Sequence, residues 1–188
     1  MNVDMMEQVL EWIRGHYFGK HRGLVEDNDD PTKRGRLKVR VPSVLGPLAV
    51  WAMPCVPYAG KGVGFYSLPD AGTGVWIEFE AGDPSFPIWT GCFWADDELP
   101  DQSSAALKIW KTSTVTLRID DDAKEVVLSS SDGGSVGVTA EVALKAGDAA
   151  RPARHTVTSS SVVSEVDAIK TEVTSASFSV NNGALEVI

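Results

Sequence analysis

The C-terminal half of the sequence contains almost no aromatic residues. Beyond Trp110 the only Phe, Tyr or Trp is Phe178, and 22 of the 28 Ser and Thr residues lie after position 100. Such a segment cannot fill a thick globular core, and disorder is the simplest interpretation of a Ser/Thr-rich tail. Apolar residues nevertheless alternate with polar ones over 115–119, 126–128 and 136–146. Because this period-two pattern is too regular for a linker, it predicts β-strands with a narrow apolar face.

These predicted strands need a partner. Turn signals at 120–122, 131–134, 146–148 and 181–183 separate them, and their small, β-branched apolar residues imply a thin interior. One chain would leave its strand edges unpaired, whereas three chains wound together would pair every edge and share one core. The pattern therefore favours an assembly of three copies.

We expect residues 113–188 to form an intertwined homotrimeric β-helix or β-prism, with about nine or ten strands per chain. Its shaft core is expected to include Val136, Val138, Val142 and Leu144. A single-chain solenoid is less favoured, because no fixed repeat period is visible. Residues 148–156 break the alternating pattern, and the sequence assigns them no role.

Residues 60–94 have a different composition, with closely spaced glycines and three of the six tryptophans. Strand-like runs such as 75–80 are cut by turn signals, and further strands are expected at 21–26 and 36–42. About five antiparallel strands within 18–95 fit a five-stranded OB-like barrel better than a sandwich, which usually has seven or more strands.

The segment 50–57 contains Pro54 and Pro57, which predict an edge strand or an irregular crossing of the barrel. The complete predicted fold class is all-β, with a short N-terminal helix. The expected domains are a helix over 1–17, an OB-fold domain over 18–95, a linker and shaft start over 96–112, and a trimeric β-helical shaft over 113–188.

The N-terminal residues show an amphipathic helical pattern. Apolar residues recur near the i, i+3, i+4, i+7 spacing, while Glu7, Glu11 and Arg14 lie elsewhere on the helical wheel. The members of this stripe are Val3, Met6, Val9, Leu10, Ile13 and Tyr17. The helix could cap the barrel, which is the favoured reading, or dock onto a partner protein.

Length and charge narrow the possible functions. With 188 residues, of which 43% are hydrophobic, the chain can build one core but hardly two, so one half should depend on a partner. A net charge of -9 is unfavourable for binding nucleic acid or anionic membranes. The sequence has neither a run of roughly 20 apolar residues nor a signal-peptide pattern, which predicts synthesis in the cytoplasm.

Cys55 and Cys92 are predicted to be buried free thiols in a reducing compartment.

Two charged segments have alternative interpretations. The acidic turn 27–31 resembles half a calcium loop, but Pro31 occupies the place of the third carboxylate ligand, so an Asx-type turn is favoured. Strand 36–40 carries Arg36, Lys38 and Arg40 on one face. That face could bind nucleic acid, but a solvated face or a protein contact is favoured, because stacking aromatic residues are not interleaved with it.

The sequence offers no catalytic constellation. His16, His21 and His155 are scattered, and no serine lies in a GxSxG motif. Glu78 and Glu80 share one face of a predicted strand, where a solvated outer face is far more common than an acid pair. We therefore expect no enzymatic activity, no cofactor and no metal site.

The N-terminal half resembles the OB-fold domain of contractile-tail spike proteins, the family of phage baseplate assembly protein V and the VgrG spikes of type VI secretion and extracellular contractile injection systems. The resemblance covers roughly residues 17–95, and its most specific part runs from Val75 to Gly91. The motifs that carry it are 18–23, 30–31, 35–36, 39–42, 51–54, 64–65, 75–84 and 87–91.

This resemblance implies a structural role. In such machines a trimeric spike closes the end of the inner tube beneath a hub protein and is driven through the target envelope when the sheath contracts. The predicted protein is therefore a membrane-piercing spike that touches the target cell envelope transiently. It would be made in the bacterial cytoplasm and then become part of a virion baseplate or injection system. A hub contact through Met6, Val9 and Ile13 is predicted on the N-terminal side.

The C-terminal end departs from one pattern of the family. Several phage spikes of this family end in a His-x-His pair that binds iron at the apex, whereas this chain ends in 181–188 without histidine. Its last apolar residues, Leu185, Val187 and Ile188, predict a contact with a separate PAAR-like tip protein. Two alternative functions stay open, a trimeric receptor-binding fibre or adhesin and, less favoured, an OB-fold nucleic-acid-binding protein.

Overall fold

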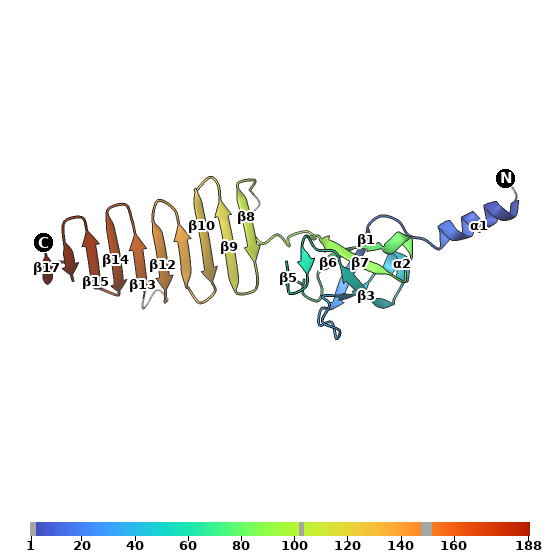
Figure 1. Cartoon of the computed structure of the whole chain (residues 1–188), viewed down its shortest axis with the longest axis horizontal. Helices are drawn as coiled ribbons and strands as arrows, with labels where there is room; N and C mark the ends of the chain where they lie inside the picture. The colour runs from blue at the N-terminus through green and yellow to red at the C-terminus, as the bar shows by residue number, and fades with distance from the viewer. Residues whose placement is uncertain (1–2, 102–103, 148–151) are drawn as a thin grey trace. The chain divides into compact units, whose positions relative to one another are not determined.

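The computed structural model describes residues 3–101, 104–147 and 152–188. It divides into two compact units, Met1–Glu98 and Leu99–Ile188. The first contains a short helix and a closed five-stranded barrel, and the second contains a ten-stranded antiparallel sheet (Figure 1). The mostly β architecture and the OB-like barrel predicted from the sequence are thus confirmed.

The barrel closes in the strand order β1-β2-β3-β7-β6, in which β3 and β7 are parallel and the other pairs antiparallel. Its strands are β1 (His21–Asp27), β2 (Leu37–Arg40), β3 (Ala49–Pro54), β6 (Gly74–Phe79) and β7 (Pro87–Cys92). A four-residue helix, α2 (Pro42–Leu45), follows β2, and a short hairpin of β4 (Ala59–Gly60) and β5 (Val63–Gly64) precedes β6.

The core of the first unit lies inside the barrel, because alternate residues of its strands point inward. Along β6, for example, Val75, Ile77 and Phe79 are buried while the residues between them are half-exposed. The buried cluster consists of Val25, Leu37, Val39, Val41, Ala52, Val75, Ile77, Phe79 and Trp89.

Strand β3 is not an edge strand, contrary to the expectation from its prolines. It pairs with β2 on one side and with β7 on the other. Pro54 is tolerated because it is the last residue of the strand, and the next backbone N–H, that of Cys55, donates to the carbonyl of Trp89 at 2.9 Å. The proline therefore removes little from the ladder.

Helix α1 (Val3–Arg14) ends three residues before the predicted boundary at Tyr17. Its described side chains are exposed, so the apolar stripe does not cap the barrel as expected. Instead, the backbone N–H of Tyr17 donates to the carbonyl of Gly82 at 2.8 Å. Gly82 has a φ of 86°, and a Cβ there would lie 2.8 Å from the ring of Phe18, so this close approach requires glycine.

The two cysteines are free, as predicted, but both are exposed rather than buried. Cys92 is the final residue of β7 and Cys55 directly follows β3, so both lie where the barrel strands end. Cys92 still pairs with Val75 in the ladder, but alternation along β7 places it on the side opposite the buried Pro87 and Trp89, which explains its exposure.

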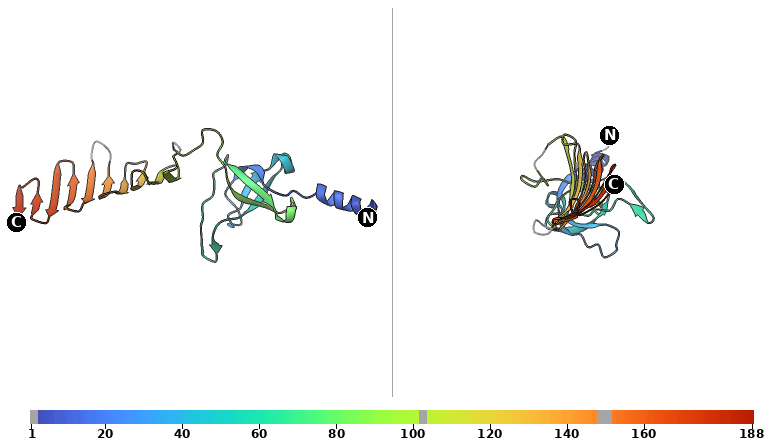
Figure 2. Two further views of the ribbon diagram at one scale, coloured as in Figure 1. Left: turned by 90° about the horizontal axis from the view of Figure 1, so that it is seen from above. Right: turned by 90° about the vertical axis from the view of Figure 1, so that its left-hand side faces the viewer.

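The second unit is a meander in which each strand pairs with the next along the chain, in the order β8 to β17. Its strands twist progressively about the stacking direction (Figure 2). They are β8 (Leu107–Lys111), β9 (Val115–Asp120), β10 (Glu125–Ser130), β11 (Ser135–Val138), β12 (Val142–Ala146), β13 (Ala153–Val157), β14 (Ser161–Val166), β15 (Ile169–Thr174), β16 (Phe178–Val180) and β17 (Leu185–Val187).

This pairing shows that unpaired strand edges are not the reason why the sheet would need other copies of the chain. Single chains were expected to leave their strand edges unpaired, but successive strands of one chain pair with each other through the whole sheet. The described strands form no intertwined β-helix within this chain. What one chain leaves uncovered is a face of the sheet, as described below.

Two details of the predicted strand pattern also change. The alternating series 136–146 is broken by a turn, in which the backbone N–H of Thr139 donates to the carbonyl of Glu141 at 2.8 Å. Of the segment 148–156, residues 148–151 lie outside the described residues, while Ala153 to Thr156 belong to β13. Alternation alone could not reveal either feature, because it continues across short turns.

Candidate assembly face of the ten-stranded sheet

The ten-stranded sheet has one face on which apolar side chains form a continuous row. Residues directly opposite each other in paired strands point to the same side of a sheet. The register of the pairs links nine successive strands through apolar residues only: Ile119, Val126, Val138, Val142, Val157, Val162, Val173, Phe178 and Val187. We call the side that carries this row the apolar face.

A second row runs beside the first on the apolar face. Its members, from β8 to β17, are Trp110, Leu117, Leu128, Val136, Leu144, His155, Ser164, Thr171, Val180 and Leu185. A third, shorter row crosses β12 to β15 through Ala146, Ala153, Val166 and Ile169. The second row is the middle one on these four strands.

The apolar face is exposed in the single chain. The nine side chains of the first row are between 36% and 59% exposed, whereas the barrel core residues are at most 6% exposed. Large contiguous apolar surfaces on soluble proteins usually mark contacts with other molecules. This face is therefore the candidate functional site of the second unit.

The opposite face is mostly polar and carries ion pairs, although Val127, Ala143 and Val163 also lie on it. Arg118 contacts Asp120 at 2.7 Å, and Lys170 contacts Glu172 at 3.0 Å. The register also places Glu165 between Arg154 and Lys170, so unlike charges stand side by side. This face can stay in water, and only the apolar face requires a partner.

All four predicted shaft-core residues lie on the apolar face. Val136 and Val138 come from β11, Val142 and Leu144 come from β12, and all four are 41% to 47% exposed. The register pairs Val136 with Leu144 and Val138 with Val142. The structure thus brings them together on one surface, while their burial between copies stays a prediction.

The other predicted contact residues lie at two separate places. Leu185 and Val187 lie on β17 and share the apolar face, and Ile188 is 99% exposed. In α1, Met6, Val9 and Ile13 are about half exposed. Their predicted contacts with a tip protein and a hub protein stay predictions.

Sequence reasoning missed the later members of the first row. Val157, Val162, Val173 and Phe178 complete the row on β13 to β16. The available signal was the alternation within 161–166, but Ser164 interrupts the apolar pattern there. Only the register shows that the row continues past this position.

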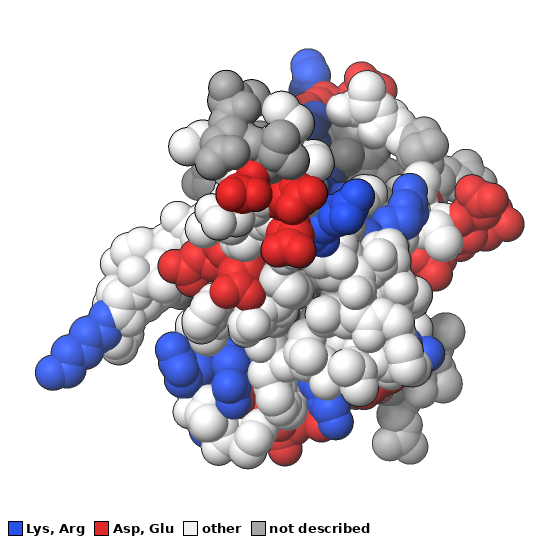
Figure 3. Space-filling model, turned by 90° about the vertical axis from the view of Figure 1, so that its right-hand side faces the viewer, with Lys and Arg blue, Asp and Glu red and all other residues white. Residues whose placement is uncertain are grey.

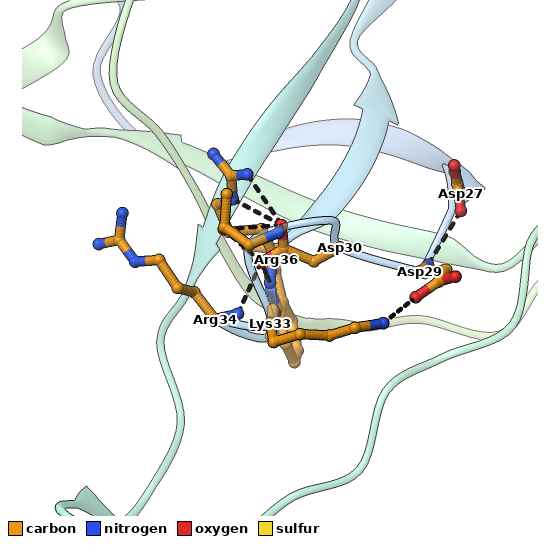
Figure 4. A network of polar contacts seen from close by, with 9 residues as sticks. Asp27, Asp29, Asp30, Lys33, Arg34 and Arg36 are labelled. Atoms are coloured by element: carbon orange, nitrogen blue, oxygen red, sulfur yellow. Dashed lines mark hydrogen bonds and ion pairs between the residues drawn. The ribbon is translucent and has the colours of Figure 1, made fainter.

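In the barrel, the acidic turn forms a network of hydrogen bonds and ion pairs (Figure 4). The backbone N–H of Asp29 donates to Asp27 Oδ1 and that of Thr32 to Asp30 Oδ1, each at 2.9 Å, which confirms the predicted Asx-type turns. The Asp30 carboxylate, which is almost fully buried, also accepts hydrogen bonds from the Arg36 guanidinium at 2.8 Å and the Arg34 N–H at 2.8 Å. The Arg36 side chain and these N–H donors hold the pKa of Asp30 far below its usual range.

Aromatic rings do lie among the basic residues of the barrel, contrary to the expectation from the sequence. The register places Trp51 beside Lys38, and the Arg36 guanidinium lies 5.3 Å from the centre of the Trp51 ring. Arg22 lies 5.1 Å and 4.6 Å from the ring centres of Trp76 and Phe93. The protein's own guanidinium groups thus cover the faces of these rings. Basic and acidic side chains are also interspersed on the face drawn in Figure 3.

The two glutamates considered above do not form a pair on one strand. Glu78 lies on β6 and contacts Lys20 Nζ at 3.0 Å, whereas Glu80 begins the short 3-10 turn η1 (Glu80–Gly82).

Within the described ranges, no three His, Cys, Asp or Glu residues of one chain are grouped as metal ligands would be. None of the described helices has the length and hydropathy of a membrane-spanning segment.

A closed barrel of five strands with mixed pairing, preceded by a helix, defines the first unit as an OB-like domain. Residues 21–94 match the family model of the type VI secretion system/phage-baseplate injector OB domain. The match confirms the resemblance inferred from residues 17–95. No curated protein matches the chain. Because the family is a structural baseplate component, this domain makes the chain a candidate part of such an assembled particle.

Proposed function

We propose that the protein is a structural spike at the baseplate or tube tip of a contractile injection machine. The observation that carries this proposal is the exposed apolar face on a ten-stranded sheet, in the same chain as an injector OB domain. A sheet with one polar and one apolar face needs a second apolar surface. Copies of the same chain supply such a surface without any further protein.

Three copies are favoured by the resemblance to trimeric spikes of contractile tails. In a three-sided prism each chain forms one side, its apolar face turned toward the common axis and its ion-paired face turned toward water. The first row then forms a continuous internal apolar layer along nine strands. The small Val side chains of this row suit the narrow interior of such a prism.

This arrangement explains how the protein could act without chemistry of its own. In the proposed machine the sheath supplies the force, so the spike has to be stiff. Each side of the prism is a ladder of backbone hydrogen bonds, and bending it would disturb many bonds at once. The net charge of -9 would keep the needle soluble and discourage adhesion to anionic lipid during its transient contact with the target envelope.

The proposed partners lie at the two ends of the chain. The exposed stripe of α1, with Met6, Val9 and Ile13, is proposed to contact a hub protein. Leu185, Val187 and Ile188 are proposed to contact a PAAR-like tip protein, because an apolar end of a shaft should be covered. The protein would be made in the bacterial cytoplasm and then incorporated into the particle.

Binding assays with the two partners encoded nearest to this gene test the proposal. The wild-type protein is expected to capture the tip protein, and serine substitutions of Leu185 and Val187 are expected to abolish capture. Serine substitutions of Met6, Val9 and Ile13 are expected to abolish hub binding while leaving tip binding unchanged. A wild-type protein that binds neither partner would contradict the proposed position in the machine.

The alternative of a trimeric receptor-binding fibre is favoured by the same apolar face, since fibres also assemble in threes. It predicts affinity for cell-surface glycans or proteins and no binding to a hub. Electron microscopy of particles carrying this protein separates the two functions, because a fibre would be peripheral whereas a spike lies on the tail axis.

The nucleic-acid alternative has less support. Guanidinium groups occupy Trp51, Trp76 and Phe93, whereas single-strand binders present open rings to the bases. A gel-shift assay with single-stranded DNA at low salt is expected to show no complex. Salt-sensitive binding in that assay would favour this alternative instead.

A further inference from the structure

The middle row of the apolar face is interrupted by three polar side chains. His155 on β13, Ser164 on β14 and Thr171 on β15 stand in register beside one another. They follow Leu144 on β12, and the row becomes apolar again at Val180 on β16. The polar interruption therefore lies within the sheet rather than at one of its ends.

These polar residues lie at the middle of their strands, which would place them near the axis of a trimer. On β13 the apolar face carries Ala153, His155 and Val157, so His155 is the middle one of three. The midpoint of each side of a three-sided prism is the part closest to the axis. In the trimer proposed above, on which this inference rests, three copies of His155 would therefore approach one another around the axis.

The apolar face is hollowed at the same place. A hollow of about 460 Å³ lies over β12 to β15. Its lining includes the small side chains Ala146 and Ala153 together with His155, Ser164 and Thr171. Most of the exposed surface that lines the hollow is apolar, so closing three such hollows around an axis would enclose an apolar chamber that holds the polar groups of His155, Ser164 and Thr171.

Polar groups enclosed in such a chamber need partners, because an unsatisfied buried polar group is costly. His155 Nδ1 already has one, since it lies 2.8 Å from Ser164 Oγ. When Nδ1 donates its proton to the serine oxygen, the Nε2 lone pair is left free to bind a ligand. Metal-binding histidines typically use this arrangement, in which the second ring nitrogen donates to a neighbouring group.

Contrary to the expectation from the sequence that the protein has no metal site, we propose that three His155 side chains, one from each copy, bind a single divalent transition-metal ion through Nε2 within the shaft. Imidazole is a good ligand for zinc, nickel, cobalt and iron, and three histidines with water form a common metal-binding set. Ser164 is a positioning residue that orients the ring. Because the described part of a single chain contains no cluster of three ligands, the ion would bind only to the assembly and would stabilise it.

The test uses the full-length chain without a histidine tag, stripped of metal and then incubated with Co²⁺ or Zn²⁺. Native mass spectrometry and elemental analysis are expected to show one metal ion per three chains, and Co²⁺ is expected to give visible d–d absorption bands. His155→Leu, which keeps the volume and makes the row apolar, is expected to remain trimeric and to bind no metal. His16→Gln is the matched control, since His16 lies next to α1, and it should still bind one ion per trimer.

A second variant tests the role of Ser164. Ser164→Ala is expected to weaken metal affinity about 10- to 100-fold without changing the mass of the assembly. A trimer that takes up no metal, or a His155→Leu trimer that still does, would overturn the inference and leave the proposed spike intact. A monomeric wild-type protein would overturn both the trimer and the metal site.

Discussion

The barrel and the ten-stranded sheet use the same alternation of apolar and polar residues, but with opposite results. In the barrel, Val75 and Ile77 are fully buried, because the sheet closes on itself and its inner face meets only its own side chains. In the sheet, Val162 and Val173 alternate in the same way but are 36% and 47% exposed. Alternation thus determines which residues share a face, and closure determines whether that face is buried.

Because of this difference, the stability of the two units should depend differently on protein concentration. The barrel has its core within one chain, so its unfolding should not depend on protein concentration. The sheet has its apolar face outside the chain, so its stability should rise with the concentration of copies. Variants that affect one unit and spare the other test this contrast.

The largest effect is expected from a charge on the apolar face. In the proposed trimer, Val162→Lys would place three ammonium groups in one apolar layer, and each unpaired buried charge costs several kcal/mol. We expect sedimentation velocity to show loss of the trimer, with the thermal transition of the barrel unchanged.

The neighbouring residue of the same strand provides the control. Val163 lies on the opposite face, in register with Glu172, so Val163→Lys adds a charge to a polar surface. It should leave the proposed trimer intact, because the added charge lies beside Glu172 on the face that does not form the contact. If Val162→Lys assembled as well as Val163→Lys, the apolar face would not be the contact surface.

A substitution in the barrel should have the converse effect. Ile77 is fully buried in the barrel core, and Ile77→Ala is expected to destabilise the barrel by about 2–5 kcal/mol through lost packing and a cavity. For a domain of this size the melting temperature of the barrel would fall by roughly 10 °C or more. Differential scanning calorimetry should show this shift at every protein concentration, and a concentration-dependent shift would contradict the self-contained core.

Acid should weaken the barrel through Asp30. Because the pKa of this carboxyl is lowered on folding, its contribution is fully present above the unfolded value of about 4. The contribution is lost as the pH falls below that value toward the folded pKa. Urea unfolding between pH 7 and pH 3 is expected to show a barrel that weakens at the acid end.

Asp30→Asn removes this effect and should be less stable than wild type at pH 7, with a smaller further loss in acid. Asp29→Asn is the control, because the Asp29 side chain is 80% exposed, and its stability at pH 7 should be within about 0.5 kcal/mol of wild type. Equal acid sensitivity of Asp30→Asn and wild type would show that the buried network does not set the pH dependence.

The smallest effect is expected at the surface of the barrel. The Arg22 guanidinium lies over Trp76 and Phe93, and such cation–π contacts at exposed sites contribute about 0.5–1 kcal/mol. Arg22→Ala should lower barrel stability by about that amount in urea titrations and leave the trimer unaffected. A much larger loss would mean that these rings depend on Arg22 for their packing.

The sequence predicts the elements of both units but not all of their contacts. Turn residues and alternation are local signals, which is why the barrel strands, the α1 helix and the four predicted shaft-core residues on β11 and β12 could be found. The parallel pairing of β3 with β7 joins distant segments, and no local pattern reports it. Pro54 therefore suggested an edge where the structure has a closed ladder.

The apolar face could be predicted only in part for a related reason. Val136 to Leu144 stand out because every second residue is apolar, whereas Ser164 and Thr171 hide the continuation of the first row through Val162 and Val173. Periodicity likewise indicated that α1 is amphipathic but not that its stripe stays exposed. In both cases the missing information is which surfaces meet, and that depends on the whole fold or on other chains.

The mass of the full-length protein in solution tests the central claim most directly. Sedimentation equilibrium over a range of concentrations is expected to give three times the chain mass of 20.2 kDa, with Val162→Lys reduced to a single chain. A wild-type protein that stays monomeric at all concentrations while its sheet is folded would contradict the proposal that the apolar face is buried between copies.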